Sequence, residues 1–276
     1  MNFNWNTEAM SPSQRKIADY IQKHTNQVLL LTEQEIADAV RVSIASVSRF
    51  WRSVGYKNLK EFKSKIGLQF EVSPAAKMNN VMRKLEGQEL QYHTLKNSVD
   101  HLYKTMEQFS SDSFHKAVDL LLSADKIYLH GPGPSKGLAD LFSYRMARFG
   151  MNMHLIKKGG SELFEELTHV KEEDTVVLFG FIRLLPEANV ILKHAKLIGY
   201  KTIIITDQLV FESSSDADVV LFASRGETRE FHSMIGPTFM IENLIISLGM
   251  RNKEANLAKL EQLSHLRKRY ANDLPR

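Results

Sequence analysis

The residues best suited to bind an anion lie in the segment YLHGPGPS, residues 128–135. Gly131 and Gly133 directly follow an apolar, β-rich run, and a helical pattern begins near Ser135. Glycine lets a backbone come close to a ligand, and the free amides of a helix N-terminus attract negative charge. The spacing therefore predicts an anion cradle at this turn, although a tight structural turn alone also fits a single Gly-x-Gly-x-Ser segment.

A dinucleotide cofactor is not expected at this cradle. The segment lacks the third glycine of a dinucleotide fingerprint, and the next apolar run leads from Ile156 to Lys157 instead of to an acidic residue. The chain has no cysteine, and its 10 histidines show no metal-ligand spacing. We therefore predict no cofactor and no metal site.

A second set of residues has the pattern of a DNA-binding motif, in LTEQEIADAVRVSIASVSRFWRSVGYKN. Thr32 and Glu35 form a capping-box pattern, and Ser43 is typical of a second helix start. Two short helices separated by Arg41 and Val42 predict a helix-turn-helix. Arg41 stands where glycine is common, so we expect a positive φ there at some cost. The inward positions are apolar or small: Ile36, Ala37, Val40, Val42, Val47 and Phe50.

The second of these helices carries the predicted DNA contacts. Its outward residues near the N-terminus are Ser43, Ala45, Ser46, Ser48 and Arg49. Arginine reads guanine bidentately and serine can donate or accept, so we expect Ser46 and Arg49 at base edges. Ser43, Arg52 and Lys57 are expected at phosphates. The alternative for Ser46 and Ser48 is that they are simply solvated on the helix face and contact no DNA.

The charge distribution supports this prediction. The net charge of +4 lies entirely in residues 1–70, and residues 41–65 carry seven Lys or Arg against one Glu. Such a surface attracts polyanions.

The overall composition is that of a globular protein, because hydrophobic residues make up 43% and charged residues 25% of the 276. We expect no signal peptide, no membrane span and, from the absence of cysteine, a cytoplasmic location.

A parallel sheet is expected to position the cradle. Short apolar runs alternate with helical patterns: KIYLHG, MNMHLI, TVVLFGF, KTIIITD and ADVVLFA. This alternation predicts an α/β domain with a five-stranded parallel sheet flanked by helices, and such sheets bind ligands at the carboxyl ends of their strands.

The domain boundaries follow from a predicted linker, which Pro74 indicates among its polar neighbours. We predict an all-α helix-turn-helix domain over residues 1–72, a linker and connecting helix over 73–109, and the α/β domain over 110–276.

Together these parts resemble RpiR-type bacterial transcriptional regulators, in which a helix-turn-helix precedes a SIS (sugar isomerase) domain. EIADAVRVSIASVSRFWRSVGYKNLKEFK resembles the family's DNA-binding segment, and YLHGPGPS resembles its first sugar-phosphate loop. The resemblance implies that residues 110–276 sense a phosphorylated sugar and dimerise, and that the protein controls carbohydrate genes. It places Gly131, Gly133, Pro134 and Ser135 at the ligand.

The second sugar-phosphate loop of that family departs from the pattern. Instead of Ser-x-Ser-Gly-x-Thr, the sequence has GFIRLLPE, which contains no hydroxyl, and only Glu187 matches. The favoured interpretation is that Arg183 replaces the hydroxyls with a charge-assisted contact to an acidic ligand. The alternatives are that the domain only dimerises, or that Arg183 pairs with Glu187 four residues on.

Catalysis is the alternative function, because SIS domains also occur in sugar isomerases. Isomerisation needs a base beside the substrate carbon. The candidates form no recognisable pair: His130, Glu187, Glu227, Glu230 and His232. A strand-end histidine such as His130 is more often packed or hydrogen-bonded. We therefore expect no catalytic residue, and a regulator whose partners are double-stranded operator DNA, a phosphorylated or acidic sugar, and its own copies in a homodimer or tetramer.

Overall fold

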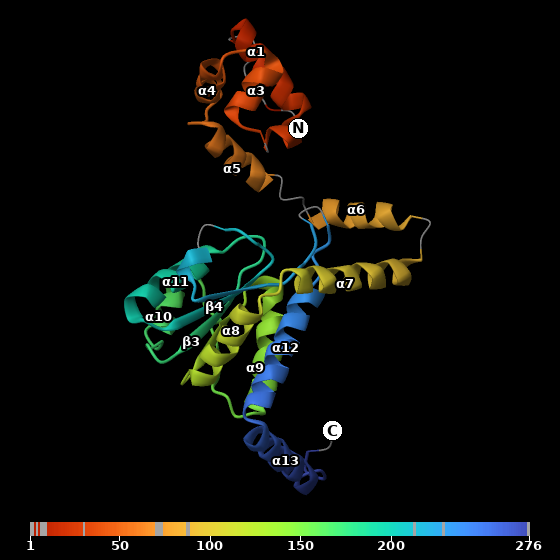
Figure 1. The fold of residues 1–276 in the computed structure, drawn as a ribbon, viewed down its shortest axis with the longest axis vertical. Helices are drawn as coiled ribbons and strands as arrows, with labels where there is room; N and C mark the ends of the chain where they lie inside the picture. The colour runs from red at the N-terminus through yellow and green to blue at the C-terminus, as the bar shows by residue number, and fades with distance from the viewer. Residues whose placement is uncertain are drawn as a thin grey trace. The chain divides into compact units, whose positions relative to one another are not determined.

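The computed structural model describes residues 3, 5, 10–29, 31–69, 74–86, 89–211, 214–227 and 230–274. The chain divides into two compact units, residues 1–80 and residues 81–276 (Figure 1). The domain boundary expected between residues 72 and 73 lies outside the described residues, so the three-part division stays a prediction.

The first unit is helical, as predicted. Its helices are α1 (Pro12–Lys23), α2 (Thr25–Val28), α3 (Glu33–Val40), α4 (Ile44–Ser53) and α5 (Leu59–Gln69). Thr32 and Glu35 form the expected capping box at α3. Ser43 caps α4, because its hydroxyl accepts a hydrogen bond from the Ser46 amide. Both caps satisfy amides that have no partner inside the helix, which fixes where each helix begins.

The turn between α3 and α4 confirms the strained position expected from the sequence. Arg41 has a φ of 55°, a left-handed conformation that glycine adopts without cost. Beyond it, α4 buries Val47, Phe50 and Trp51 completely, whereas Ile44 is 47% exposed. Full burial of such side chains contributes about 1.5–3 kcal/mol each, so this face fixes the orientation of α4 in the unit.

The second unit is built on the predicted five-stranded parallel sheet. Its strands are β1 (Ile127–His130), β2 (Met153–Leu155), β3 (Thr175–Phe179), β4 (Lys201–Thr206) and β5 (Val219–Phe222), in the order β2-β1-β3-β4-β5. The chain leaves β1 for β2 on one side and then returns to β3 on the other. Such a reversal opens a crevice at the carboxyl ends of the strands, beside β1.

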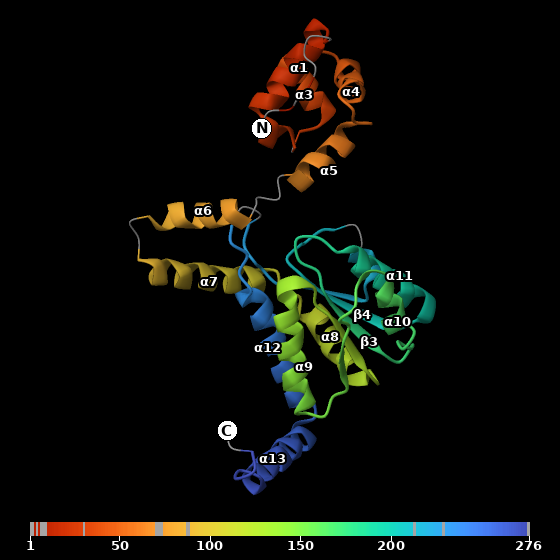
Figure 2. The same ribbon diagram turned by 180° about the vertical axis from the view of Figure 1, so that it is seen from behind.

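Helices cover both faces of this sheet (Figure 1 and Figure 2). The covering helices are α8 (Ser111–Ser123), α9 (Lys136–Ala147), α10 (Leu163–Leu167), α11 (Pro186–Ile198) and α12 (Ile235–Arg251). Two further helices, α7 (Leu90–Glu107) and α13 (Lys253–Arg269), contact α12. One apolar core joins α8, α9 and α12 to one face, and another joins α10 and α11 to the other. Successive residues of β3 enter opposite cores, as the strand period requires: Val177 lies in the first and Val176 in the second.

The segment expected as a linker is partly helical. Pro74 is the first residue of α6 (Pro74–Leu85), which crosses from the first unit into the second. Proline is well tolerated in a first helical turn, so its presence did not exclude a helix start there. No helix on the described residues combines the length and apolar character that a bilayer span requires.

Candidate functional site

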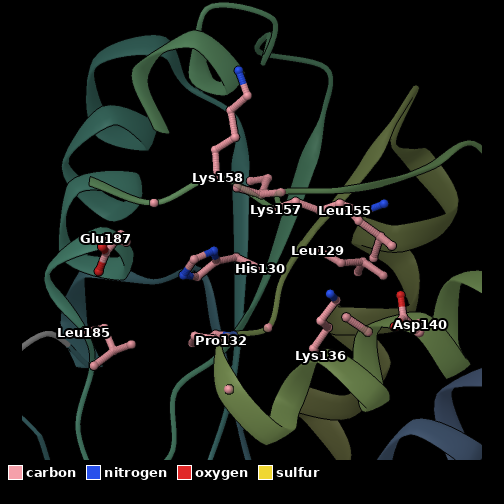
Figure 3. A pocket seen from close by; sticks show the side chains of 15 residues that line it. Leu129, His130, Pro132, Lys136, Asp140, Leu155, Lys157, Lys158, Leu185 and Glu187 are labelled. Atoms are coloured by element: carbon pink, nitrogen blue, oxygen red, sulfur yellow. The ribbon is translucent and has the colours of Figure 1, made fainter. Parts of the chain in front are cut away.

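A cavity of about 240 Å³ lies at the carboxyl ends of β1 and β2 (Figure 3). Its walls come from the segments after these strands and from the first turns of α9 and α11. The lining residues are Leu129, His130, Gly131, Pro132, Gly133, Lys136, Ala139, Asp140, Leu155, Ile156, Lys157, Lys158, Gly159, Leu185 and Glu187. The cavity therefore occupies the crevice that the strand order predicts for a ligand.

Steric constraints explain why both positions of the predicted cradle, 131 and 133, are glycine. A Cβ on Gly131 would lie 2.6 Å from the carbonyl oxygen of Ser135, and Gly133 has a φ of +57°. The loop can thus fold onto the start of α9, whose helix dipole places partial positive charge beside the cavity. Gly131 and Gly133 line the cavity, whereas Pro134 and Ser135 are not among its lining residues. Ser135 is instead buried beneath the loop.

His130 is the buried titratable group of the cavity. It ends β1, only 6% of it is exposed, and neither ring nitrogen has a hydrogen-bond partner among the described residues. Burial lowers the pKa of its imidazole, an effect that the charge of Glu187 only partly opposes. The sequence indicated a packed or hydrogen-bonded histidine. The ring of His130 is packed but forms no hydrogen bond with the part of the chain that the structure describes.

Glu187 connects two walls of the cavity. It lies in the first turn of α11, and its Oε1 accepts a hydrogen bond of 3.2 Å from the Gly160 amide, beyond β2. Hydrogen bonds from its own amide and from Gly160 lower the pKa of its carboxyl, and the charge of His130 adds a smaller effect. Glu187 therefore stays ionised at neutral pH and holds the segment after β2 against α11.

Three lysines line the cavity and were not predicted. They are Lys136 in the first turn of α9 and Lys157 and Lys158 after β2. Lys158 forms an ion pair with Glu165, which raises the pKa of its ammonium group. The acidic lining residues are Asp140 and Glu187, so the ammonium groups of Lys136 and Lys157 remain as cations outside the Lys158–Glu165 pair. The available sequence signal was the position of these lysines just beyond apolar runs, but exposed lysines are usually only solvated.

Arg183 is exposed in the turn after β3 and is not a lining residue of this cavity. The turn is set by its neighbour Ile182, which has a φ of 65°. The Ile182 amide donates a hydrogen bond of 2.7 Å to Asp207, and the side chain of Gln208 donates one to the Ile182 carbonyl. These bonds hold the turn to the segment after β4. A contact of Arg183 with the ligand stays a prediction.

The other titratable candidates from the sequence do not join His130 and Glu187 in lining the cavity. Glu230 forms an ion pair of 2.8 Å with Lys84, and Glu227 forms one of 3.6 Å with Lys104. These pairs tie the segment after β5 to α6 and α7. Among the described residues, no group of three or more His, Asp or Glu is arranged to hold a metal ion.

The predicted DNA-contact residues lie together on and beside α4. Ser43, Ala45, Arg49, Arg52 and Lys57 are exposed, and Ser46 and Ser48 are half-buried. The hydroxyls of Ser43 and Ser46 lie 2.9 Å apart, so Ser46 also contributes to the helix start. Neither Arg49 nor Arg52 forms an ion pair with another described residue. Their charges are thus available on the surface of the first unit.

A helix-turn-helix unit followed by an α/β unit with a lysine-lined cavity is the organisation of a ligand-binding transcriptional regulator. Residues 2–73 match the helix-turn-helix domain of the rpiR family, and residues 120–247 match the SIS domain. Together these ranges cover more than half of the chain. The chain therefore combines an rpiR-family helix-turn-helix domain with a SIS domain, and its relatives include HTH-type transcriptional regulators.

The relatives match this chain at low identity. The HTH-type transcriptional regulator YfhH of Escherichia coli is 25% identical over 207 residues, which is 72% of each chain. The bifunctional protein glk of Burkholderia thailandensis is 26% identical over 263 residues, or 93% of this chain and 40% of that longer protein. The structure of the Vibrio vulnificus NanR protein complexed with ManNAc-6P shares the fold. Its TM-score is 0.63 at 18% identity, and the match covers 98% of this chain and 97% of NanR.

Proposed function

We propose that the protein is a sequence-specific DNA-binding regulator of carbohydrate-related genes whose SIS domain senses a phosphorylated or acidic sugar. The observation that carries this proposal is the lysine-lined cavity at the sheet reversal, in the same chain as a helix-turn-helix with an exposed basic face. The NanR neighbour was solved with a sugar phosphate, which supports this ligand class.

In this proposal α4 enters the major groove of operator DNA. Arg49 contacts a guanine edge, because its guanidinium is exposed and has the fork geometry that bidentate readout needs. Ser46 lies beside it near the start of the helix. Arg52 and Lys57 contact phosphates and position the helix without reading sequence.

In the SIS domain the ligand anion is placed at the rim of the cavity, near Gly133 and Lys136. The amides that begin α9 and the lysine ammonium groups supply charge-assisted hydrogen bonds. Glu187 fixes the opposite wall. These groups bind and orient a ligand without a pair of free acid and base groups, so the proposal assigns the domain to sensing and not to turnover.

Self-association is part of the proposal, because one recognition helix reads few base pairs. A homodimer or tetramer in the cytoplasm would present two or more copies of α4 to half-sites of an operator. Support comes from apolar side chains that α7 leaves exposed: Leu90, Tyr92, Leu95, Tyr103 and Met106. Light scattering after gel filtration measures the mass, and a monomer at micromolar concentration would contradict this part.

The test of the sensing function is a thermal-shift screen of the full chain against phosphorylated and acidic sugars. A ligand present at a hundredfold excess over its Kd should stabilise the protein by about 2.7 kcal/mol. Lys136→Ala should weaken that ligand about tenfold, whereas Lys193→Ala, an exposed lysine of α11 outside the cavity, should not. Arg183→Ala tests whether the turn after β3 also reaches the ligand. If no compound stabilises the wild type, the sensing function is wrong.

A further inference from the structure

We propose that His130 recognises the hydroxyl groups of the ligand, so that the cavity selects a phosphorylated sugar over other anions. In this assignment one ring nitrogen donates a hydrogen bond to a sugar hydroxyl and the other accepts one, while the lysines hold the phosphate. The inference rests on the proposed function and specifies the ligand class of the same cavity.

The first support is the position of the ring. His130 is the last residue of β1, at the strand end where the sheet order reverses, and it lines the cavity. Figure 3 shows its ring projecting into the cavity between the loop at Pro132 and the wall that carries Glu187. A ligand in the cavity would therefore contact this side chain.

The second support is the missing hydrogen bonds. Both ring nitrogens of His130 are buried, and no described residue forms a hydrogen bond with either. The large majority of buried polar side-chain atoms in proteins are hydrogen-bonded, and leaving one unsatisfied costs about 1–3 kcal/mol. A leucine would fill the end of a buried strand without this cost. The histidine is thus better explained by a partner that arrives with the ligand.

The third support is the charge state of the ring. Burial lowers the pKa of His130, and the nearby carboxylate of Glu187 raises it less. The imidazole is therefore neutral at neutral pH, with one donor and one acceptor. A neutral ring adds nothing to the attraction of an anion, but it suits hydroxyl groups, which both donate and accept.

The fourth support is the arrangement of charge around the ring. The side chains of Lys136, Lys157 and Lys158 are exposed, so the cationic groups lie toward solvent. His130 lies deeper, next to the buried residues Leu129 and Ile156 of the lining. A ligand with a charged group at one end and hydroxyl-bearing carbons at the other matches this gradient. A phosphorylated sugar has that form, whereas inorganic phosphate would use only the rim.

The test compares variants of the full chain with two probes, inorganic phosphate and the sugar phosphate that best stabilises the wild type. His130→Leu removes both polar ring atoms, and His130→Gln keeps one donor and one acceptor. The matched control is His194→Leu. His194 is half-buried on α11, its Nδ1 lies 3.2 Å from the Tyr200 hydroxyl, and it is outside the cavity.

We expect His130→Leu to bind the sugar phosphate at least tenfold more weakly and inorganic phosphate equally well, by calorimetry. His130→Gln should recover part of the lost affinity. Without ligand, His130→Leu should melt at or above the wild-type temperature, because two unsatisfied polar atoms are removed. His194→Leu should melt lower and bind as the wild type does.

Three outcomes would overturn the assignment. Sugar-phosphate affinity within twofold of wild type in His130→Leu would show that the ring does not contact the ligand. A variant that fails to fold, or melts several degrees lower, would make His130 a structural residue. An equal loss for inorganic phosphate would make it part of the anion site. If neither probe binds the wild type, the proposed sensing function itself fails, which is a distinct result.

Discussion

The two recognition surfaces of this protein differ in how their polar groups are held. On α4 the residues proposed to contact DNA are exposed or half-buried, so water satisfies them until DNA arrives. In the SIS domain His130 is buried, and neither ring nitrogen has a hydrogen-bond partner within the described ranges. A long charged polymer can be recognised on an open face, whereas recognition of a small ligand needs groups kept away from water. Substitutions on the exposed face of α4 should therefore affect function alone, and substitutions at the cavity should affect function and stability together.

Substitutions in the two cores should have the largest effects and should distinguish the two units most clearly. Phe50 is fully buried in the core of the first unit, and Phe142 is fully buried in a core of the second. Phe50→Ala should cost about 3–5 kcal/mol and abolish DNA binding while the ligand-induced thermal shift remains. Phe142→Ala should abolish that shift. Calorimetry with a gel-shift assay measures both, and loss of both functions in Phe50→Ala would show that the units do not fold separately.

Gly131→Ala should combine loss of stability with loss of ligand binding. The new methyl group would lie 2.6 Å from the Ser135 carbonyl oxygen, so the loop must move, at a cost of about 1–3 kcal/mol. Gly137→Ala is the control, because a Cβ there meets nothing within 4 Å in α9. That change should stabilise the protein by up to about 1 kcal/mol. Similar melting temperatures for the two variants would show that the loop is not tightly packed.

Substitutions of the exposed residues proposed to contact DNA should change DNA binding without changing the free energy of unfolding. Arg49→Ala should lose about 1–3 kcal/mol of discrimination between operator and random DNA. Lys57→Ala should weaken binding to all sequences and reduce its salt dependence. Both variants should melt within about 0.5 kcal/mol of wild type, since both side chains are exposed. Gel shifts like those of the wild type for both would show that α4 does not lie in the groove as proposed.

The smallest expected effect is a pH dependence of stability. The pKa of His130 is lowered in the folded protein from a value of 6.5, so the unfolded chain binds this proton more readily. The stability from the neutral ring is complete above about pH 6.5 and decreases as the pH falls toward the folded pKa. Its slope is at most about 1.4 kcal/mol per pH unit. His130→Leu should therefore lose less stability than wild type between pH 7.5 and pH 5.5 in urea titrations. Equal losses would contradict the buried, neutral state.

The sequence predicted the fold well where the signal is local. The caps at Thr32 and Ser43 and the apolar runs of the sheet are each encoded within a few residues, and each appears as expected. Pro74 shows the limit of such signals, because the same residue suits both a linker and a first helical turn.

The candidate site was predictable only in part, because its residues come together from separate segments. The glycines of the cradle could be found from their spacing. Lys136 and Lys158 could not, since their role depends on β1 and β2 being adjacent in the sheet. The charge of Arg183 near a strand end predicts a ligand contact, but the backbone turn at Ile182 sets where that segment lies. A β-branched residue gives no local sequence signal for such a turn. The unsatisfied state of His130 is a property of packing and appears only in the structure.

The turn at Ile182 has a consequence for engineering the protein as a biosensor. A β-branched residue at a φ of 65° costs on the order of 1–3 kcal/mol, and here Asp207 and Gln208 hold it in place. Glycine at this position would remove the strain without altering the sheet. A library built on residues 181–185 with Ile182→Gly as its parent would thus begin from a more permissive loop, and it could be selected for response to new inducers while the DNA-reading unit stays constant.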